Sequence, residues 1–196
     1  FHSAEPSAPG PYHRPGHVPH AVAEKSDGQS VCAVLRGRER SRSAVDSFHV
    51  KKSIEDGTNV VAGVTPGKGG ETHLGIPVFN TVEEAVKATS ANASIMFVPA
   101  RQVVSAVTEG VKAGLDLMVC IADNVPVKDM LEVKAILKGS RTKLIGPNTP
   151  GLITPSAARL GIFPANIHFP GRVGIVSRSS TLTYEAVIET NRIKAG

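Results

Sequence analysis

A glycine-rich loop with one lysine is the first place in this sequence where residue types and spacing indicate chemistry. A β-branched apolar run ends in the segment V-V-A-G-V-T-P-G-K-G-G, residues 60–70. Glycines let the backbone turn sharply or come close to a ligand, and Lys68 can place a positive charge beside a phosphoryl oxygen. The spacing is not that of a P-loop, because Gly69 rather than Ser or Thr follows the lysine. A sharp turn that carries a solvated lysine fits the spacing at least as well.

Short apolar runs alternate with helical patterns from Thr58 onward. The runs are continuously apolar, which is typical of strands buried on both faces. The predicted strands are residues 59–64, 94–98, 115–121, 143–146 and 172–176. Three helices are predicted between them from a T-x-x-E capping box and two apolar stripes. The residues concerned are Thr81 with Glu84; Val103, Val104, Val107 and Val111; and Met130, Leu131 and Leu137. This order predicts an α/β fold with a doubly wound parallel sheet.

Ligands of such sheets lie beyond the carboxyl ends of the strands. The segments expected there are 64–68, 98–100, 121–124 and 146–150, and three of the four carry a proline. We therefore expect Pro66, Val98, Pro99 and Asn148 to line the rim of a binding site. Prolines that simply end strands are the plainer interpretation of the same pattern.

Composition limits the classes of protein that this chain can represent. With 196 residues, of which 41% are hydrophobic, it can build one core and the beginning of a second. Cys32 and Cys120 are far apart, so neither a disulfide framework nor a metal site is expected. A net charge of +5 suits an anionic partner, but aromatic residues make up only 4%. A phosphorylated small molecule explains the charge as well as a nucleic acid does, and we expect neither a nucleic acid nor a membrane as partner.

The first 30 residues are rich in Pro, His, Ser and Gly and poor in apolar side chains. Such a segment cannot offset the entropy lost on ordering, so we expect a disordered leader. Its histidines lack cysteine or carboxylate partners at the spacing of metal ligands, and no metal is expected there.

Three longer segments resemble one known family. They read V-A-G-V-T-P-G-K-G-G-E-T-H-L-G-I-P-V-F-N-T-V-E-E-A-V, then I-G-P-N-T-P-G-L-I-T-P, then V-G-I-V-S-R-S-S-T-L-T-Y-E-A-V. They are similar to the alpha subunit of succinyl-CoA synthetase, the succinate–CoA ligase of the citric acid cycle, from about residue 48 to residue 187. The resemblance implies a Rossmann-like CoA-binding domain over residues 31–155 and the start of a flavodoxin-like ligase domain over residues 170–196. It also implies a beta subunit that carries the nucleotide site.

The resemblance assigns roles to individual residues. Lys68 matches a lysine that faces a CoA phosphate, and Ile121, Ala122 and Asp123 match a tripeptide beside CoA. The family usually has I-T-E-G there, whereas this chain has I-A-D-N, which removes a hydroxyl and shortens an acid. Tyr184 matches a residue of the substrate site.

The start of the last helical pattern resembles a phosphate-facing helix of the family. Ser179, Ser180 and Thr181 stand there, where free N–H groups and the helix dipole favour the phosphate of a phosphohistidine. An ordinary helix N-cap is the alternative interpretation of these residues.

Two departures from the family bear on activity. After the predicted strand 31–35, arginines at 36, 38, 40 and 42 replace a glycine loop, so phosphate would be bound there by side-chain charge. A solvated arginine run or an unrelated leader is the alternative. The 196 residues also contain no G-H-A-G-A segment, which holds the phosphorylated histidine of the family. We therefore expect a truncated, divergent form without catalytic residues of its own, inactive alone.

The leading functional prediction is the CoA-binding alpha subunit of a succinate–CoA ligase, which forms succinyl-CoA, NDP and phosphate from succinate, CoA and NTP. Coenzyme A is the expected cofactor, while Mg²⁺ and ATP or GTP would be bound only through the beta subunit. The alternatives are a non-catalytic CoA-binding or beta-subunit-docking protein, a malate–CoA ligase relative, and an unproductive translation product. The expected location is the cytoplasm for a bacterial protein and the mitochondrial matrix for a eukaryotic one.

Overall fold

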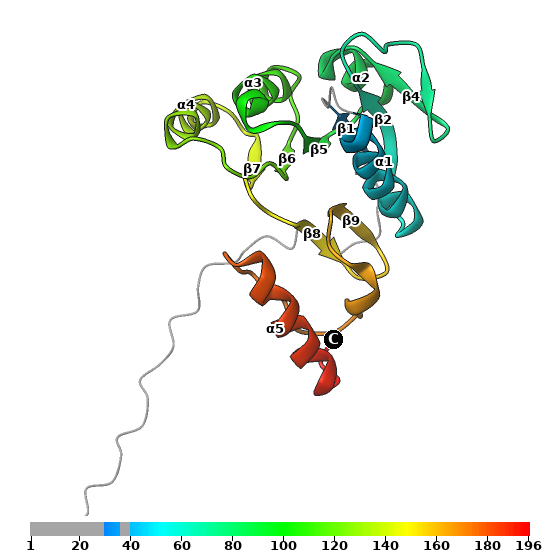
Figure 1. The fold of residues 1–196 in the computed structure, drawn as a ribbon, viewed down its shortest axis with the longest axis vertical. Helices are drawn as coiled ribbons and strands as arrows, with labels where there is room; N and C mark the ends of the chain where they lie inside the picture. The colour runs from blue at the N-terminus through cyan, green and yellow to red at the C-terminus, as the bar shows by residue number, and fades with distance from the viewer. Residues whose placement is uncertain (1–29, 36–39) are drawn as a thin grey trace, which may run out of the picture.

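The computed structural model describes residues 30–35 and 40–196 of the chain (Figure 1). The predicted disordered leader therefore lies almost wholly outside the described residues. The same holds for Arg36 and Arg38, and for the side chains of Arg40 and Arg42.

The central element is a seven-stranded sheet in the order β3-β4-β2-β1-β5-β6-β7. All neighbouring strands are parallel except β3 and β4, which form an antiparallel pair. The strands are β1 (Val31–Leu35), β2 (Val60–Val64), β3 (Thr72–His73), β4 (Ile76–Phe79), β5 (Ala93–Phe97), β6 (Leu117–Cys120) and β7 (Lys143–Ile145). The prediction of an α/β fold with a mostly parallel sheet is confirmed, and four of the five predicted strands form within two residues of their predicted bounds.

One face of the sheet packs against three helices. These are α2 (Val82–Thr89), α3 (Val103–Lys112) and α4 (Val127–Lys138). Cys32, Met96 and Met118 are fully buried beneath them in the larger apolar cluster of the structure. This continuous burial explains why the strands are apolar throughout.

The opposite face is covered differently. Val31, Ile95 and Val119 point to it and contact Leu160, which belongs to a β-hairpin formed by β8 (Gly151–Thr154) and β9 (Ala158–Gly161). Helix α1 (Arg40–Glu55) lies beside the hairpin and contacts β9 (Figure 1). A hairpin therefore takes part of the surface where a doubly wound sheet usually has helices.

Local signals in the sequence are sufficient to start α2. The Thr81 Oγ1 atom accepts a hydrogen bond from the N–H of Glu84 at 3.1 Å, and the Glu84 carboxylate accepts one from the N–H of Thr81 at 3.3 Å. This reciprocal pair confirms the predicted capping box.

The apolar stripe predicted for α4 is wrong at one position. Leu131 is 64% exposed, whereas Val133 is fully buried against the core. Successive helix residues are about 100° apart, and Val133 with its half-buried neighbours Met130 and Leu137 occupies the face that meets the sheet. Leu131 lies outside that arc.

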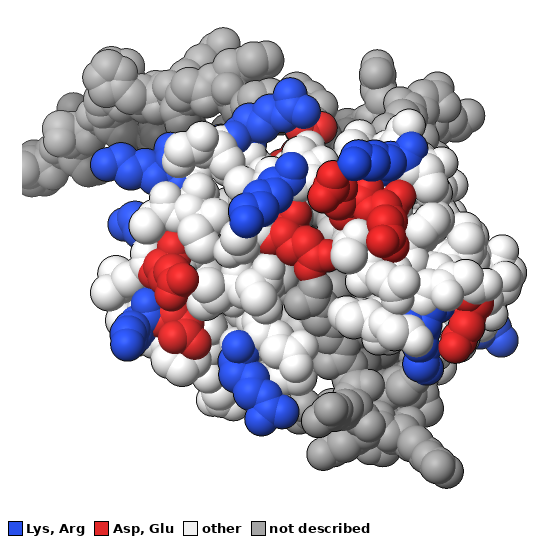
Figure 2. Space-filling model, turned by 90° about the horizontal axis from the view of Figure 1, so that it is seen from above, with Lys and Arg blue, Asp and Glu red and all other residues white. Residues whose placement is uncertain are grey.

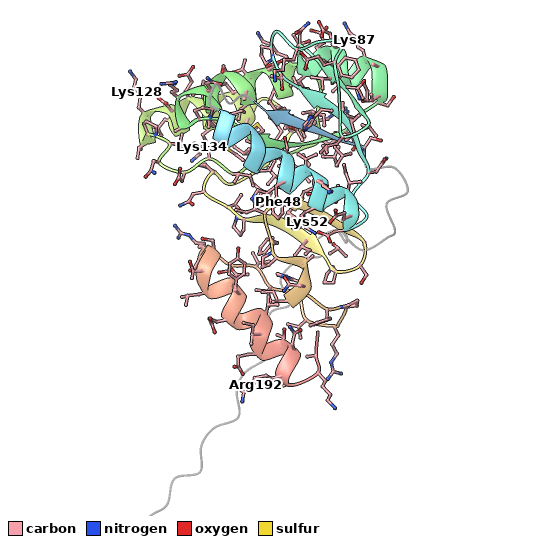
Figure 3. All side chains as sticks on the ribbon, turned by 45° about the vertical axis from the view of Figure 1, so that its right-hand side comes forward. Phe48, Lys52, Lys87, Lys128, Lys134 and Arg192 are labelled. Carbon is pink, nitrogen blue, oxygen red and sulfur yellow. The ribbon has the colours of Figure 1, made fainter. Side chains whose placement is uncertain are left out.

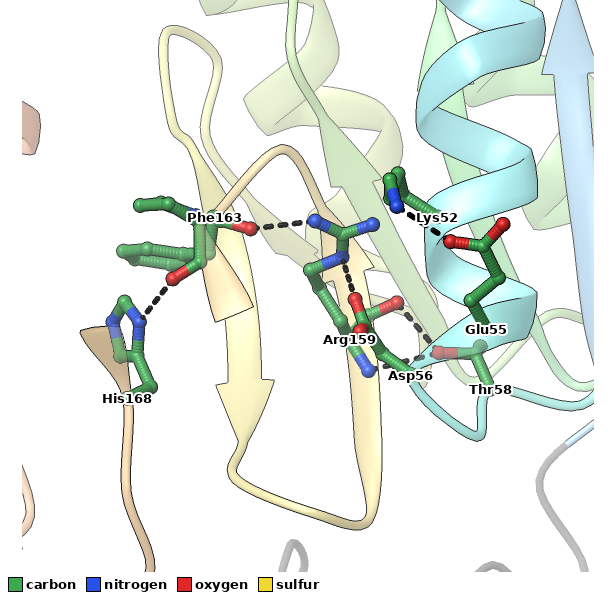
Figure 4. A network of polar contacts seen from close by, with 8 residues as sticks. Lys52, Glu55, Asp56, Thr58, Arg159, Phe163 and His168 are labelled. Carbon is green, nitrogen blue, oxygen red and sulfur yellow. Dashed lines mark hydrogen bonds and ion pairs between the residues drawn. The ribbon is translucent and has the colours of Figure 1, made fainter. Parts of the chain in front are cut away.

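The buried Arg159 joins the hairpin to the rest of the fold (Figure 4). Its Nε lies 3.0 Å from a carboxylate oxygen of Asp56, and its Nη1 donates to the carbonyl of Phe163 at 2.6 Å. The backbone N–H of Arg159 donates to the Thr58 hydroxyl, and that hydroxyl donates to the Arg159 carbonyl, both at 2.8 Å. Burial lowers the pKa of the guanidinium, and the charge of Asp56 opposes the shift. The hairpin is thereby attached to the turn between α1 and β2.

Beyond the hairpin, the chain continues through a short 3₁₀ turn (Ala165–Ile167) to helix α5 (Ser180–Arg192). The strand predicted over residues 172–176 does not form: Arg172 donates one backbone hydrogen bond to Ala195, and Val176 is fully exposed. A strand needs a neighbour to accept and donate its backbone hydrogen bonds, and no described strand lies alongside this segment.

The described residues lack both a membrane-spanning helix and a cluster of metal-ligating side chains. No helix among them is long and apolar enough to cross a membrane. Within the same part of the chain, no three His, Cys, Asp or Glu side chains gather closely enough to hold a metal ion.

Candidate functional site

The parallel strands bring most of the predicted binding residues to one edge of the sheet. Strands β2, β5, β6 and β7 run in the same direction, so the segments that follow them leave the sheet at the same edge. This is the edge where open α/β sheets bind their ligands. The predicted residues located there are Pro66, Lys68, Val98, Pro99, Ile121, Ala122, Asp123 and Asn148.

The glycine loop after β2 is a compact turn. The N–H of Lys68 donates to the Thr65 carbonyl at 3.1 Å, and the N–H of Glu71 donates to the Lys68 carbonyl at 3.2 Å. Gly67 and Gly70 have φ angles of 82° and 89°, which lie in the left-handed region that glycine adopts without strain. The two glycines are therefore needed for the path of the backbone.

Asn80 closes this loop from the far side, and sequence reasoning did not single it out. Its Oδ1 accepts hydrogen bonds from the N–H groups of Gly67 and Gly69, at 2.9 and 3.0 Å. A Cβ atom at Gly69 would lie 2.3 Å from the Asn80 Nδ2 atom, so any other residue there would displace the Asn80 side chain. The signal available in the sequence was its place, directly after β4 and directly before the capping residue Thr81.

The loop displays the Lys68 side chain to solvent. Lys68 is exposed, and within the described residues its ammonium group forms no ion pair. An exposed lysine on a tightly bonded turn can serve as a point charge for a phosphate.

The segments after β6 and β7 are bonded to each other. The N–H of Asn148 donates to the Ala122 carbonyl at 2.7 Å. Gly146 has a φ angle of 94°, and a Cβ atom there would lie 2.4 Å from the Cys120 carbonyl oxygen. The structure thus brings together two predicted binding segments that are more than twenty residues apart, with the Asp123 side chain exposed beside them.

The end of β5 contributes mainly to the core. Val98 is only 5% exposed, so its side chain packs inside the protein rather than at the rim. Pro99 is half-buried, and its carbonyl accepts a hydrogen bond from Gln102 at 2.8 Å as a 3₁₀ turn (Ala100–Gln102) leads into α3.

A second candidate site is a cleft of about 970 Å³ between the hairpin and α5. Asn148 and Ser180 both line this cleft, together with Thr149, His168, Arg178 and Thr183. Lys68 is not among its lining residues. Of the predicted site residues, only Asn148 and Ser180 line this cleft, and Asn148 also belongs to the sheet edge; Ser179, Thr181 and Tyr184 are not among the lining residues.

The start of α5 has the geometry of an N-cap. The Ser179 Oγ accepts a hydrogen bond from the N–H of Leu182 at 3.3 Å, and the Thr183 hydroxyl donates to the Ser179 carbonyl. Ser180 is half-buried and Thr181 is exposed. The N–H of Ser179 also donates to the Ser177 hydroxyl at 3.0 Å, so at least two of the four orphan donors at this helix end are bonded within the protein.

Tyr184 packs beside the cleft rather than lining it. Its ring meets Phe163 edge-on with centroids 5.9 Å apart, and Phe163 meets His168 in the same way at 5.2 Å. Partial burial raises the pKa of the Tyr184 hydroxyl.

Among the side chains that the structure describes, which leave out those of the arginine run, cations come from several elements. Figure 2 shows Lys and Arg interspersed with Asp and Glu on the face that it presents. The labelled cations Lys52, Lys87, Lys128 and Arg192 project from four different helices (Figure 3). The cations labelled there do not come from one element, whereas a nucleic-acid interface needs basic side chains clustered on one face.

Comparison with known proteins identifies relatives of the chain. Residues 31–124 match the family model of the CoA binding domain. A succinate–CoA ligase (ADP-forming) alpha subunit from Aquifex aeolicus is 49% identical over 178 residues, which is 90% of this chain and 56% of that protein. The corresponding protein of Staphylococcus epidermidis is 52% identical over 140 residues, 71% of this chain and 46% of that protein. The chain thus spans about half the length of these curated relatives.

Solved structures with the same fold include enzymes that act on CoA compounds. An apo acetyl-coenzyme A synthetase, dinucleotide forming, from Candidatus Korarchaeum cryptofilum matches with a TM-score of 0.66 at 17% identity, over 84% of this chain and 36% of that one. An ATP citrate lyase from Methanothrix soehngenii, solved with citrate and coenzyme A, matches with a TM-score of 0.62 at 21% identity, over 87% of this chain and 30% of that one. At these identities the likeness concerns the fold alone.

The family match begins at Val31, the first residue of β1, and so includes the strand that precedes the arginine run. This match agrees with the identities near 50% to curated alpha subunits. By its sequence, the chain belongs to the family of succinate–CoA ligase alpha subunits.

Proposed function

We propose that residues 31–155 bind coenzyme A at the carboxyl edge of the sheet, with Lys68 holding one phosphate. The observation that carries the proposal is the display of Lys68 on a tightly bonded turn at that edge, in a chain that matches the CoA binding domain. A charge fixed on a turn loses little conformational freedom when it binds a phosphate.

The remaining predicted residues form the rest of the proposed site. Ile121, Ala122 and Asp123 would lie along the coenzyme, held in place by the hydrogen bond between Ala122 and Asn148. Pro66 and Pro99 would restrict the backbone at the rim, because proline fixes φ. The buried Val98 supports this rim from within the core.

We infer that the reaction served is the ligation of a carboxylic acid to CoA at the expense of a nucleoside triphosphate. The acid would be succinate, as the names of the relatives indicate, and malate is the alternative within this chemistry. A beta subunit would supply the nucleotide and Mg²⁺. Tyr184 and the start of α5 (Ser179, Ser180, Thr181) would face the acid and the transferred phosphate.

Calorimetric titration of the 196-residue chain with CoA tests the binding proposal. Lys68→Ala should weaken the affinity about tenfold or more, the loss expected for one charge-assisted contact. Lys87→Ala is the matched control, because Lys87 is an exposed lysine whose ammonium is already paired with Glu83 at 2.6 Å. Equal affinities of the wild-type, Lys68→Ala and Lys87→Ala proteins would contradict the role of Lys68.

A second experiment concerns catalysis by these residues alone. The 196 residues contain no G-H-A-G-A segment, so we expect no covalent phosphate on them when they are mixed with a family beta subunit, Mg²⁺ and γ-labelled nucleotide. A stoichiometric phosphohistidine mapped to His73 or His168 would overturn this expectation.

A further inference from the structure

The glycine loop has no backbone N–H group to offer a phosphate. Lys68, Gly70 and Glu71 donate their N–H groups to the carbonyls of Thr65, Val78 and Lys68, at 2.9 to 3.2 Å. The N–H group of Gly67, just before Lys68, and that of Gly69, just after it, both donate to the Oδ1 atom of Asn80. Five consecutive donors from residue 67 to residue 71 are therefore satisfied within the protein. Loops that bind phosphate through their backbone leave such groups free and convergent.

Asn80 is itself held from behind. Its own N–H donates to a carboxylate oxygen of Glu84 at 3.0 Å, and the same oxygen accepts the N–H of Thr81. The capping box of α2 therefore fixes the backbone of Asn80, while the side chain reaches across to the loop. Its amide lies directly over Gly69, where a Cβ atom would displace it.

We propose that Asn80 is a positioning residue that closes the glycine loop and makes it a rigid mount for Lys68. The loop then contributes one side-chain charge, and no backbone amides, to binding a phosphate of the coenzyme. Recognition by a single ammonium group follows charge rather than the directional geometry of a backbone cradle. This inference rests on the proposed function for its ligand, but the closure of the loop does not.

Amide hydrogen exchange followed by NMR tests the closure without any ligand. The N–H groups of Gly67 and Gly69 should be protected in the wild-type protein and lose protection in Asn80→Ala. Asn80→Asp should retain the protection, because a carboxylate oxygen can still accept both bonds. Asn191→Ala is the matched control: the Asn191 side chain also bonds a distant backbone group, donating to the carbonyl of Ile167, but it lies on α5. Unprotected glycine amides in the wild-type protein would overturn the proposal, even if CoA binds.

A double-mutant cycle with CoA tests the positioning role. Asn80→Ala should weaken CoA binding about threefold to tenfold when Lys68 is present, the effect of one misplaced charge-assisted contact. It should have no further effect in the Lys68→Ala background, because Asn80 acts only through that lysine. Additive losses would contradict the proposal, as they indicate a merely structural role.

Two further readouts separate the possible outcomes. Asn80→Asp should keep the loop closed but weaken CoA binding, and the loss should shrink as salt is added, because a second charge then lies near the phosphate. Tighter binding of CoA by Asn80→Ala would show instead that the released amides bind phosphate, and would refute the proposal. If the wild-type protein binds no CoA, the proposed function fails, while the exchange experiment still decides whether the loop is closed.

Discussion

The sheet region (residues 30–145) and the C-terminal region (residues 146–196) differ in how far their apolar segments are buried. In the sheet region, apolar runs lie between neighbouring strands and are buried on both faces, as residues 31–34 of β1 show. In the C-terminal region, the apolar run 172–176 has no neighbouring strand, and Val176 is fully exposed. Leu182 and Ile193, on and just after α5, are also mostly exposed, at 66% and 74%.

The difference shows that an apolar pattern in the sequence indicates which segments would gain from burial. It does not show whether the folded protein buries them. Each strand of the sheet region obtains hydrogen-bond partners from its neighbours and apolar contacts from α2, α3 and α4 or from the hairpin. In the C-terminal region the hairpin packs on the sheet through Leu160, but the residues beyond the hairpin have few buried apolar side chains, among them Phe163 and Val187. Stability should therefore be concentrated in the sheet region, and paired substitutions can test this.

Paired leucine substitutions should show the largest contrast. Leu115 is fully buried in the main cluster, so Leu115→Ala should lower the free energy of unfolding by about 3 kcal/mol, from lost transfer energy and the cavity left behind. Leu182→Ala should change it by less than about 0.5 kcal/mol, since that side chain is already exposed. Urea unfolding measures both. A large loss at Leu182 would mean that the C-terminal region is buried in solution.

Paired arginine substitutions test the link between the two regions. Arg159→Met removes a buried ion pair and the bond to Phe163, and should cost roughly 2 to 3 kcal/mol, less than for a fully buried pair because Asp56 keeps some contact with water. Arg141→Met is the control: its pair with Asp116 is 79% and 58% exposed and should contribute at most about 1 kcal/mol. Equal effects in thermal or urea unfolding would show that Arg159 does not anchor the hairpin.

Two helix caps give a smaller contrast. Thr81→Ala breaks a reciprocal capping box and should cost about 1 kcal/mol. Ser179→Ala removes a single 3.3 Å bond at the start of α5 and should cost roughly half as much or less. Unfolding free energies from urea titration are compared with that of the wild-type protein. The reverse order would argue that α5 belongs to the most stable part of the molecule.

The smallest expected effect is a pH dependence from His49 on α1. Burial, and then the charge of Arg159, lowers the pKa of His49 below its ordinary 6.5. Its ring stacks on Phe97, and Asp56 is the carboxylate paired with that arginine. The unfolded chain therefore binds the proton more readily, so stability is full above about pH 6.5 and falls as the pH drops through the lowered pKa. His49→Gln should reduce this acid-side loss of unfolding free energy, and an unchanged pH profile would exclude the contribution.

Much of the candidate site follows from local sequence. Thr81 and Glu84 form their capping box within four residues, and Gly67 with Gly70 makes the turn that displays Lys68. The segments after the parallel strands could be assigned to one edge because strand direction is set by the alternation of strands and helices.

Asn80 could not be predicted because its partners, Gly67 and Gly69, precede it by more than ten residues and β3 and β4 lie between them. Nothing in the residue types alone shows that a side chain will satisfy those amides. The same limit applies to Leu131 and Val133 on α4, where only the packed neighbour decides which face is inside.

The sequence by itself determined the alternation of strands and helices, the parallel sheet and the lysine-bearing turn, because these depend on contacts within a few residues and on apolar content. Only the tertiary structure decided the joining of Thr58 to Arg159 across 101 residues, the closing of the glycine loop by Asn80 and the loss of the strand at residues 172–176. Each of these depends on whether a backbone or polar group finds a partner in another part of the chain, and an unsatisfied buried group is costly enough to decide the outcome.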